Sequence, residues 1–223
     1  MIDIDLWTKQ YQKTVQDLFG SRILFIGLQG SYGRNEAGEN SDIDVVLILD
    51  KVSLLDLKQY KQAIKTLPDS SSICGFVSGR QELAGWCRSD LFQFYHDTIP
   101  YYGDLDAIIP ATTEVDIRSA ILLGACNLYH ACSHNFIHSG DIETLKALYK
   151  PTFFILQAKH YLESGNYIRS HSALEAVLVG TDLKILQSAG QIKTAEASQD
   201  SLEQYSELML CWTGELIDKY QAE

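Results

Sequence analysis

The stretch that decides the fold runs from residue 23 to residue 49 and reads ILFIGLQGSYGRNEAGENSDIDVVLIL. It opens with an apolar run at residues 23–26 and closes with a second one at residues 43–49. Short apolar runs rich in β-branched residues are typical of buried strands. The segment between them is polar and rich in glycine, so we expect two strands joined by the loop that carries the chemistry.

Two short motifs lie in this loop. Gly30 and Ser31 close the first strand, ten residues follow, and Asp42-Ile43-Asp44 opens the second. Residues two apart in a strand project from the same face, so Asp42 and Asp44 present two carboxylates side by side while Ile43 points into the core. An Asp-x-Asp sequence alone also fits a solvated strand start, but the Gly-Ser pair at this distance favours a site.

The paired carboxylates predict a site for Mg²⁺ and a nucleoside triphosphate. Mg²⁺ takes a few carboxylate oxygens and completes its octahedron with water and substrate phosphates, and two such ions can assist in-line displacement at a phosphate. Gly30 lets the backbone approach phosphate oxygens, Ser31 donates from its hydroxyl and amide, and Arg34 neutralises phosphate charge. Ser41 is a further nucleotide-binding candidate, with a local cap or turn role as the alternative.

Gly30-Ser31, the ten-residue spacer and Asp42-x-Asp44 between apolar strands together resemble the signature of the DNA polymerase beta superfamily of nucleotidyltransferases. The resemblance covers residues 20–110. Members resembling this chain are compact bacterial enzymes, including aminoglycoside and lincosamide nucleotidyltransferases and minimal nucleotidyltransferases paired with helical HEPN-type domains. The resemblance implies that Ser31 holds the triphosphate and that Asp42 and Asp44 bind the catalytic metals.

One feature of the superfamily pattern is missing from this sequence. The resemblance implies a third carboxylate on the next central strand, as metal ligand or general base, yet residues 73–79 read ICGFVSG without an acid. Glu82 is our candidate for this catalytic role, and Asp97 and Asp104 are weaker ones. Otherwise the base comes from the helical half or from the substrate, or the chain binds nucleotide with weakened catalysis.

The remaining pattern predicts two domains. Up to residue 106, helical and strand-like segments alternate, with helices expected at 4–19, 54–67 and 80–97 and further strands at 73–77 and 99–102. After Pro110 the segments are mostly helix-compatible, at 115–137, 143–162, 170–178, 182–187 and 201–220. We expect an α+β fold: a polymerase-beta-like domain with a small mixed sheet at 1–110, then an all-α, HEPN-like bundle that binds substrate at 111–223.

Composition restricts the partners. The 223 residues carry 18 Lys and Arg against 29 Asp and Glu, a formal net charge of -11, which is unsuited to clamping a nucleic acid polymer. The first residues lack a secretory signal and no apolar stretch is long enough to span a bilayer, so we expect a cytoplasmic protein without a membrane partner. Five Cys without a CxxC pair indicate reduced thiols.

The helical half has one constellation of its own, with Cys126, His130, His134 and His138 each four residues apart. Neighbouring histidines on one helix face can share a metal, line an acceptor cleft or simply pack. Their role stays open.

These observations predict an enzyme that transfers a nucleoside monophosphate, AMP in the first instance, from a Mg-bound triphosphate to a hydroxyl or phosphate of a small molecule, releasing pyrophosphate. The rivals are an antitoxin-like regulator that nucleotidylates or binds a partner protein, and a non-catalytic nucleotide-binding protein. A homodimer is compatible with the sequence.

Overall fold

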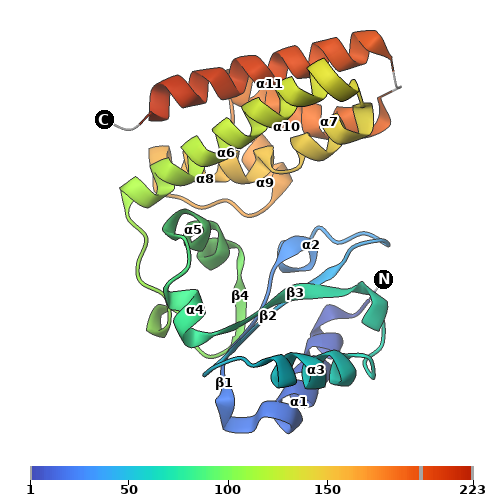
Figure 1. Ribbon diagram of the computed structural model, residues 1–223, viewed down its shortest axis with the longest axis vertical. Helices are drawn as coiled ribbons and strands as arrows, with labels where there is room; N and C mark the ends of the chain where they lie inside the picture. The colour runs from blue at the N-terminus through green and yellow to red at the C-terminus, as the bar shows by residue number, and fades with distance from the viewer. Residues whose placement is uncertain (1, 196–197, 222–223) are drawn as a thin grey trace. The chain divides into compact units, whose positions relative to one another are not determined.

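The computed structural model describes residues 2–195 and 198–221, and the chain divides into two units, Met1–Ala111 and Thr112–Glu223 (Figure 1). The first unit holds the four strands found in the described residues, and the second is built of helices. The predicted α+β class, with a small mixed sheet domain followed by a helical region, is confirmed.

The first unit alternates helices and strands. Its main elements in chain order are α1 (Ile4–Phe19), β1 (Ile23–Leu28), α2 (Gly30–Gly33), β2 (Ile43–Leu49), α3 (Leu54–Ile64), β3 (Ile73–Gly79), α4 (Arg80–Ala84), α5 (Arg88–Asp97) and β4 (Ile99–Tyr102). Helix α1 begins where the Asp3 carboxylate accepts the Leu6 N–H at 3.0 Å, and it ends at Gly20 with φ +53°.

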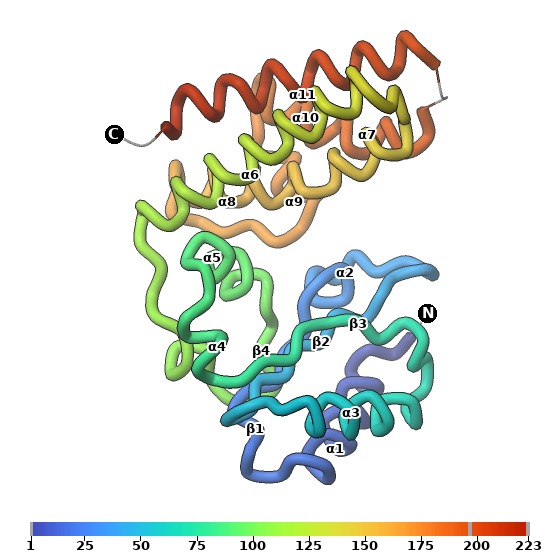
Figure 2. Tube along the Cα trace, in the orientation of Figure 1, coloured from blue at the N-terminus to red at the C-terminus, as the bar shows by residue number. Residues whose placement is uncertain are grey.

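The sheet has the strand order β3-β2-β1-β4, in which β2 and β3 run parallel and the other neighbours antiparallel (Figure 2). These directions bring the end of β1 and the starts of the other three strands to one edge. We call it the site edge; it is marked by Leu28, Ile43, Ile73 and Ile99. The Gly-Ser pair and the Asp-x-Asp motif therefore meet there.

Alternate residues of β2 face two separate cores. Val45 belongs to a core with Tyr11 of α1 and residues of α3, whereas Val46 belongs to a core with Leu83 of α4 and Leu91 of α5. The sheet is thus covered on both faces, which explains why β2 reads as a nearly continuous apolar run.

The second unit is a helical bundle. Its helices are α6 (Glu114–His134), α7 (Ile142–Tyr149), α8 (Thr152–Ser164), α9 (His171–Glu175), α10 (Gly180–Gln191) and α11 (Gln199–Tyr220), with a π-helical turn at Asn135–Ser139 after α6. Helix α6 packs along α11 and α8. Asp182 of α10 connects three helices, because its carboxylate pairs with Lys159 of α8 and accepts the indole N–H of Trp212 of α11 at 2.8 Å. Nowhere in 2–195 or 198–221 does a helix reach the length and apolarity needed to cross a bilayer.

Two predicted helices are interrupted. The one expected at 80–97 breaks at Gly85, which takes the chain out of α4 before α5 begins at Arg88. The one expected at 143–162 breaks at Pro151, because proline has no N–H to continue the ladder of α7 and instead starts α8. The helix expected at 54–67 ends three residues early, at Ile64.

Candidate active site

The turn after β1 is held against the start of β2. The Gln29 N–H donates to the Asp44 carbonyl at 2.8 Å, which extends the contact between the two strands past Leu28. The chain then turns at Gly30, whose φ of +67° is a left-handed value that glycine adopts without strain. This geometry places the Gly-Ser pair directly beside the Asp-x-Asp motif.

Gly30 lies against the carboxylate of Asp44. A Cβ built on Gly30 would stand 1.9 Å from Asp44 Oδ2 and 2.9 Å from its Cγ. No side chain larger than hydrogen fits this position while the carboxylate stays in place. The sequence predicted a glycine that lets phosphate approach the backbone; the structure adds that it leaves room for a carboxylate.

The two aspartates differ in environment. Asp42 precedes β2 and is exposed, Asp44 lies in β2 and is partly buried, and Ile43 between them is fully buried, as the alternation predicted. Burial, followed by the charge of Asp42, raises the pKa of Asp44, whereas Arg34 and a hydrogen bond from the Cys74 thiol lower it. A carboxylate pair with such repulsion gains from a bound cation.

Arg34 follows the Gly-Ser pair, at the end of α2, and is part of a charged cluster. Its Nη1 donates to Asp97 Oδ2 at 2.8 Å, and its Nε lies 3.5 Å from Glu36 Oε2. The side chains of Arg34 and Asp97 are only 11% and 8% exposed. Arg34 is thus a largely buried cation near Asp44.

The junction between α5 and β4 supports the same turn. The Gln29 side-chain amide donates to the Thr98 hydroxyl at 2.7 Å and to the Phe94 carbonyl at 3.3 Å. Together with the ion pair of Asp97, these bonds link the junction to the segment around Gly30. The sequence did not single out Gln29 or Thr98, because only the pairing of β1 with β4 brings residues so distant in the chain together.

The two serines lie in different settings. Ser31 is partly buried in the first turn of α2, and its carbonyl accepts the Glu36 N–H at 2.8 Å. The Ser41 hydroxyl accepts the Gly38 N–H at 2.9 Å and so shapes the loop before β2. The structure therefore places Ser31 at the site edge and gives Ser41 the turn contact that was its alternative role.

Glu82 does not lie with the carboxylate pair. Its side chain sits beside Gly79 at the far end of β3, where a Cβ on Gly79 would stand 2.3 Å from Glu82 Oε2. Asp44 pairs with Cys74, five residues before Gly79, so Glu82 is displaced by roughly 17 Å along the strand at about 3.3 Å per residue. A contribution of Glu82 to the pair therefore has no support in this structure.

The other weak candidates for a third acid are also engaged elsewhere. Asp97 is the partner of Arg34, and Asp104 accepts the Asp106 N–H at 2.9 Å beyond the end of β4 that lies away from the site edge. Within the described ranges, no group of three or more His, Cys, Asp or Glu side chains is arranged to hold a metal. At the site edge, the protein itself offers the two carboxylates of the Asp-x-Asp motif, and a magnesium ion would need phosphate and water to complete its shell.

The histidines of the helical unit are exposed and close together. The ring centroids of His130 and His134 are 6.1 Å apart, and those of His134 and His138 are 4.6 Å apart, across the π-helical turn. Among the described residues, no further partner of these histidines decides their role.

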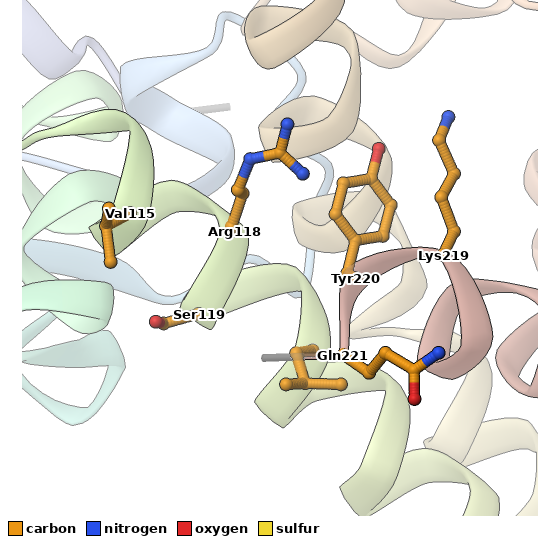
Figure 3. A pocket seen from close by; sticks show the side chains of 7 residues that line it. Val115, Arg118, Ser119, Lys219, Tyr220 and Gln221 are labelled. Atoms are coloured by element: carbon orange, nitrogen blue, oxygen red, sulfur yellow. The ribbon is translucent and has the colours of Figure 1, made fainter. Parts of the chain in front are cut away.

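A pocket in the helical unit has a volume of about 480 Å³ and lies between the start of α6 and the end of α11. Figure 3 shows the Tyr220 ring standing between Arg118 and Lys219 at its wall. Both cations already have acidic partners, Glu114 at 3.0 Å and Glu163 at 3.1 Å. Both cations at the wall of this pocket are therefore already neutralised by acidic side chains.

Comparison with known proteins agrees with this geometry. Residues 8–74 match the family model described as nucleotidyltransferase domain. The crystal structure of spectinomycin adenyltransferase AAD(9) from Enterococcus faecialis with ATP and spectinomycin is similar, with a TM-score of 0.58, 13% identity, and coverage of 95% of this chain and 98% of that one. At 13% identity, this similarity shows a shared fold. No curated protein matches the sequence.

The family match lies on the segment that carries Gly30, Ser31, Asp42 and Asp44, and the shared fold extends over both units. The chain therefore contains a nucleotidyltransferase domain, in a polymerase-beta-like fold that is followed by a helical C-terminal part.

Proposed function

We propose that the protein transfers a nucleoside monophosphate from a Mg-bound nucleoside triphosphate to a hydroxyl or phosphate of a small molecule, with release of pyrophosphate. The observation that carries this proposal is the contact of Gly30 with Asp44 at the site edge, beside Asp42 and Ser31. The Gly30 backbone and the Ser31 hydroxyl suit the phosphates of a triphosphate. The two carboxylates beside them at the site edge suit its cation.

Each residue has a role in this proposal. Asp42 and Asp44 would hold Mg²⁺, which when bound supplies charge neutralisation of the triphosphate and of the leaving pyrophosphate. Ser31 donates to phosphate oxygens from its hydroxyl and amide, and the Gly30 backbone lets the phosphates approach. Arg34, held by Asp97, adds positive charge beside Asp44.

ATP is the first nucleotide and spectinomycin the first acceptor to test, because the structurally similar adenyltransferase was solved with both. The acceptor is expected to be a small molecule bound with help of the helical domain, taken as residues 111–223, while residues 1–110 hold the nucleotide. The homodimer and the cytoplasmic location stay predictions.

Thermal unfolding with each of the four triphosphates, with and without Mg²⁺, tests the nucleotide site. A ligand that binds only the folded state stabilises it, by about 2.7 kcal/mol at a hundredfold excess over Kd. We expect a Mg-dependent shift with ATP that disappears in the Asp42→Ala, Asp44→Ala double variant. The control is Asp104→Ala, Asp106→Ala, an exposed pair with the same spacing elsewhere in the unit.

Pyrophosphate release in the presence of candidate acceptors tests the transfer. A specific observation favours the second candidate function, a nucleotide-binding protein without transfer: β3 sets Cys74 rather than an acid beside Asp44. That candidate predicts the same Mg-dependent shift without pyrophosphate release. No shift with any triphosphate in the wild type would contradict both. The antitoxin-like role stays a prediction, tested with a protein acceptor.

A further inference from the structure

The residue beside Asp44 on the neighbouring strand is a cysteine. In the parallel register of β2 and β3, Asp44 pairs with Cys74. Ile73 belongs to the core shared with α1 and α3, so Cys74 projects from the opposite face, as Asp44 does. Cys74 is also exposed, so its thiol is reachable at the site edge.

The backbone fixes this register locally. Gly75, next to Cys74, has φ +141°, and a Cβ there would stand 2.0 Å from the Val45 carbonyl oxygen. Because Gly75 has no side chain, β3 can pack closely against β2 at this point. Cys74 is therefore held close to Asp44 by the strand pairing itself.

The thiol can serve Asp44 in one way that a carboxylate cannot. An S–H group is a hydrogen-bond donor, whereas an ionised carboxylate only accepts. In the register of β2 and β3, the Cys74 thiol lies on the same face as the Asp44 carboxylate and can donate to it. It does so without adding a third negative charge to the pair.

We propose that Cys74 is a positioning residue of the nucleotide site, which donates its thiol proton to Asp44 and holds that carboxylate in place beside Gly30. Its consequence for metal binding rests on the proposed function. Because the site edge then offers two charged protein ligands instead of three, Mg²⁺ binds together with the triphosphate rather than before it.

The test measures the Mg²⁺ concentration that gives half of the ATP-dependent rise in melting temperature, for the full-length protein at fixed ATP. Groups that hydrogen-bond a metal ligand are worth about tenfold to a hundredfold in metal affinity, and a thiol is a weak donor. We therefore expect Cys74→Ala to need about tenfold more Mg²⁺, and Cys74→Ser, which keeps a donor, to stay near the wild type. Cys74→Asp, which adds a carboxylate, should need less Mg²⁺.

The control is Cys126→Ala, which removes an exposed thiol from the helical unit and should leave the Mg²⁺ requirement unchanged. The melting temperature without ligand monitors folding of each variant. A merely space-filling role of Cys74 would change that temperature but not the Mg²⁺ requirement, and this result would overturn the proposal.

The two proposals fail in different ways. If the wild type has no Mg-dependent ATP shift, the proposed function fails and the role of Cys74 fails with it. If the wild-type shift is present and vanishes in the Asp42→Ala, Asp44→Ala variant, but Cys74→Ala matches the wild type, only the positioning role is overturned.

Discussion

Replacing Gly30 by alanine should change the geometry of the site more than the stability of the fold. The new methyl carbon would stand 1.9 Å from Asp44 Oδ2, about 1.5 Å closer than an ordinary contact of 3.4 Å. Either the carboxylate or the β1–α2 turn must therefore move by more than 1 Å. In addition, an alanine at φ +67° carries strain of about 1–2 kcal/mol.

The expected result is a loss of nucleotide binding larger than the loss of stability. A misplacement of about 1 Å costs on the order of a hundredfold in precisely arranged sites. We expect Gly30→Ala to reduce the apparent affinity for Mg-bound ATP by about a hundredfold, while urea unfolding reports a loss of about 1–3 kcal/mol. Ligand-dependent melting temperatures and urea unfolding measure the two quantities.

Gly165→Ala is the matched control, because Gly165 has a similar φ of +72° and a Cβ there meets nothing within 4 Å. Gly165→Ala should carry the same backbone strain without lowering the apparent affinity for Mg-bound ATP. A double-mutant cycle of Gly30→Ala with Asp44→Ala, measured as the free energy of unfolding, isolates the collision. Alanine at position 44 keeps only the Cβ, which lies 3.2 Å from a Cβ built on Gly30. Wild-type ATP affinity in Gly30→Ala, or a cycle without coupling, would refute the reasoning.

Two further predictions concern the charges of the site. The raised pKa of Asp44 means that ionised Asp44 destabilises the ligand-free fold above that pKa, and that this penalty fades as the pH falls through it. Asp44→Asn should thus raise the melting temperature near pH 7, and the difference from the wild type should shrink in acid; a lower melting temperature at pH 7 would contradict this. Arg34→Ala or Asp97→Ala should each cost about 3 kcal/mol in urea unfolding, because a buried charge loses its partner, and the double variant should cost less than the sum of the two. Additive losses would show that the two charges do not depend on each other.

Periodicity and turn signals decided much of the first unit. The apolar run at residues 43–49 predicted β2 with its observed bounds, and helical spacing at residues 4–19 predicted α1. These are local effects of side-chain period and backbone freedom, so sequence alone captures them. The interruptions at Gly85 and Pro151 are local as well, and the helical spacing on both sides concealed them.

The amino-acid sequence by itself predicted that Gly30-Ser31 and Asp42-x-Asp44 belong to one candidate site, because their spacing and strand context are encoded within one short segment. Only the tertiary structure decided what surrounds the pair. The parallel register of β2 and β3 put Cys74 beside Asp44 and carried Glu82 to the far end of the strand, and the pairing of β1 with β4 brought Asp97 to Arg34. Strand order and register depend on contacts between distant residues, and a shift of one residue would turn Cys74 to the other face.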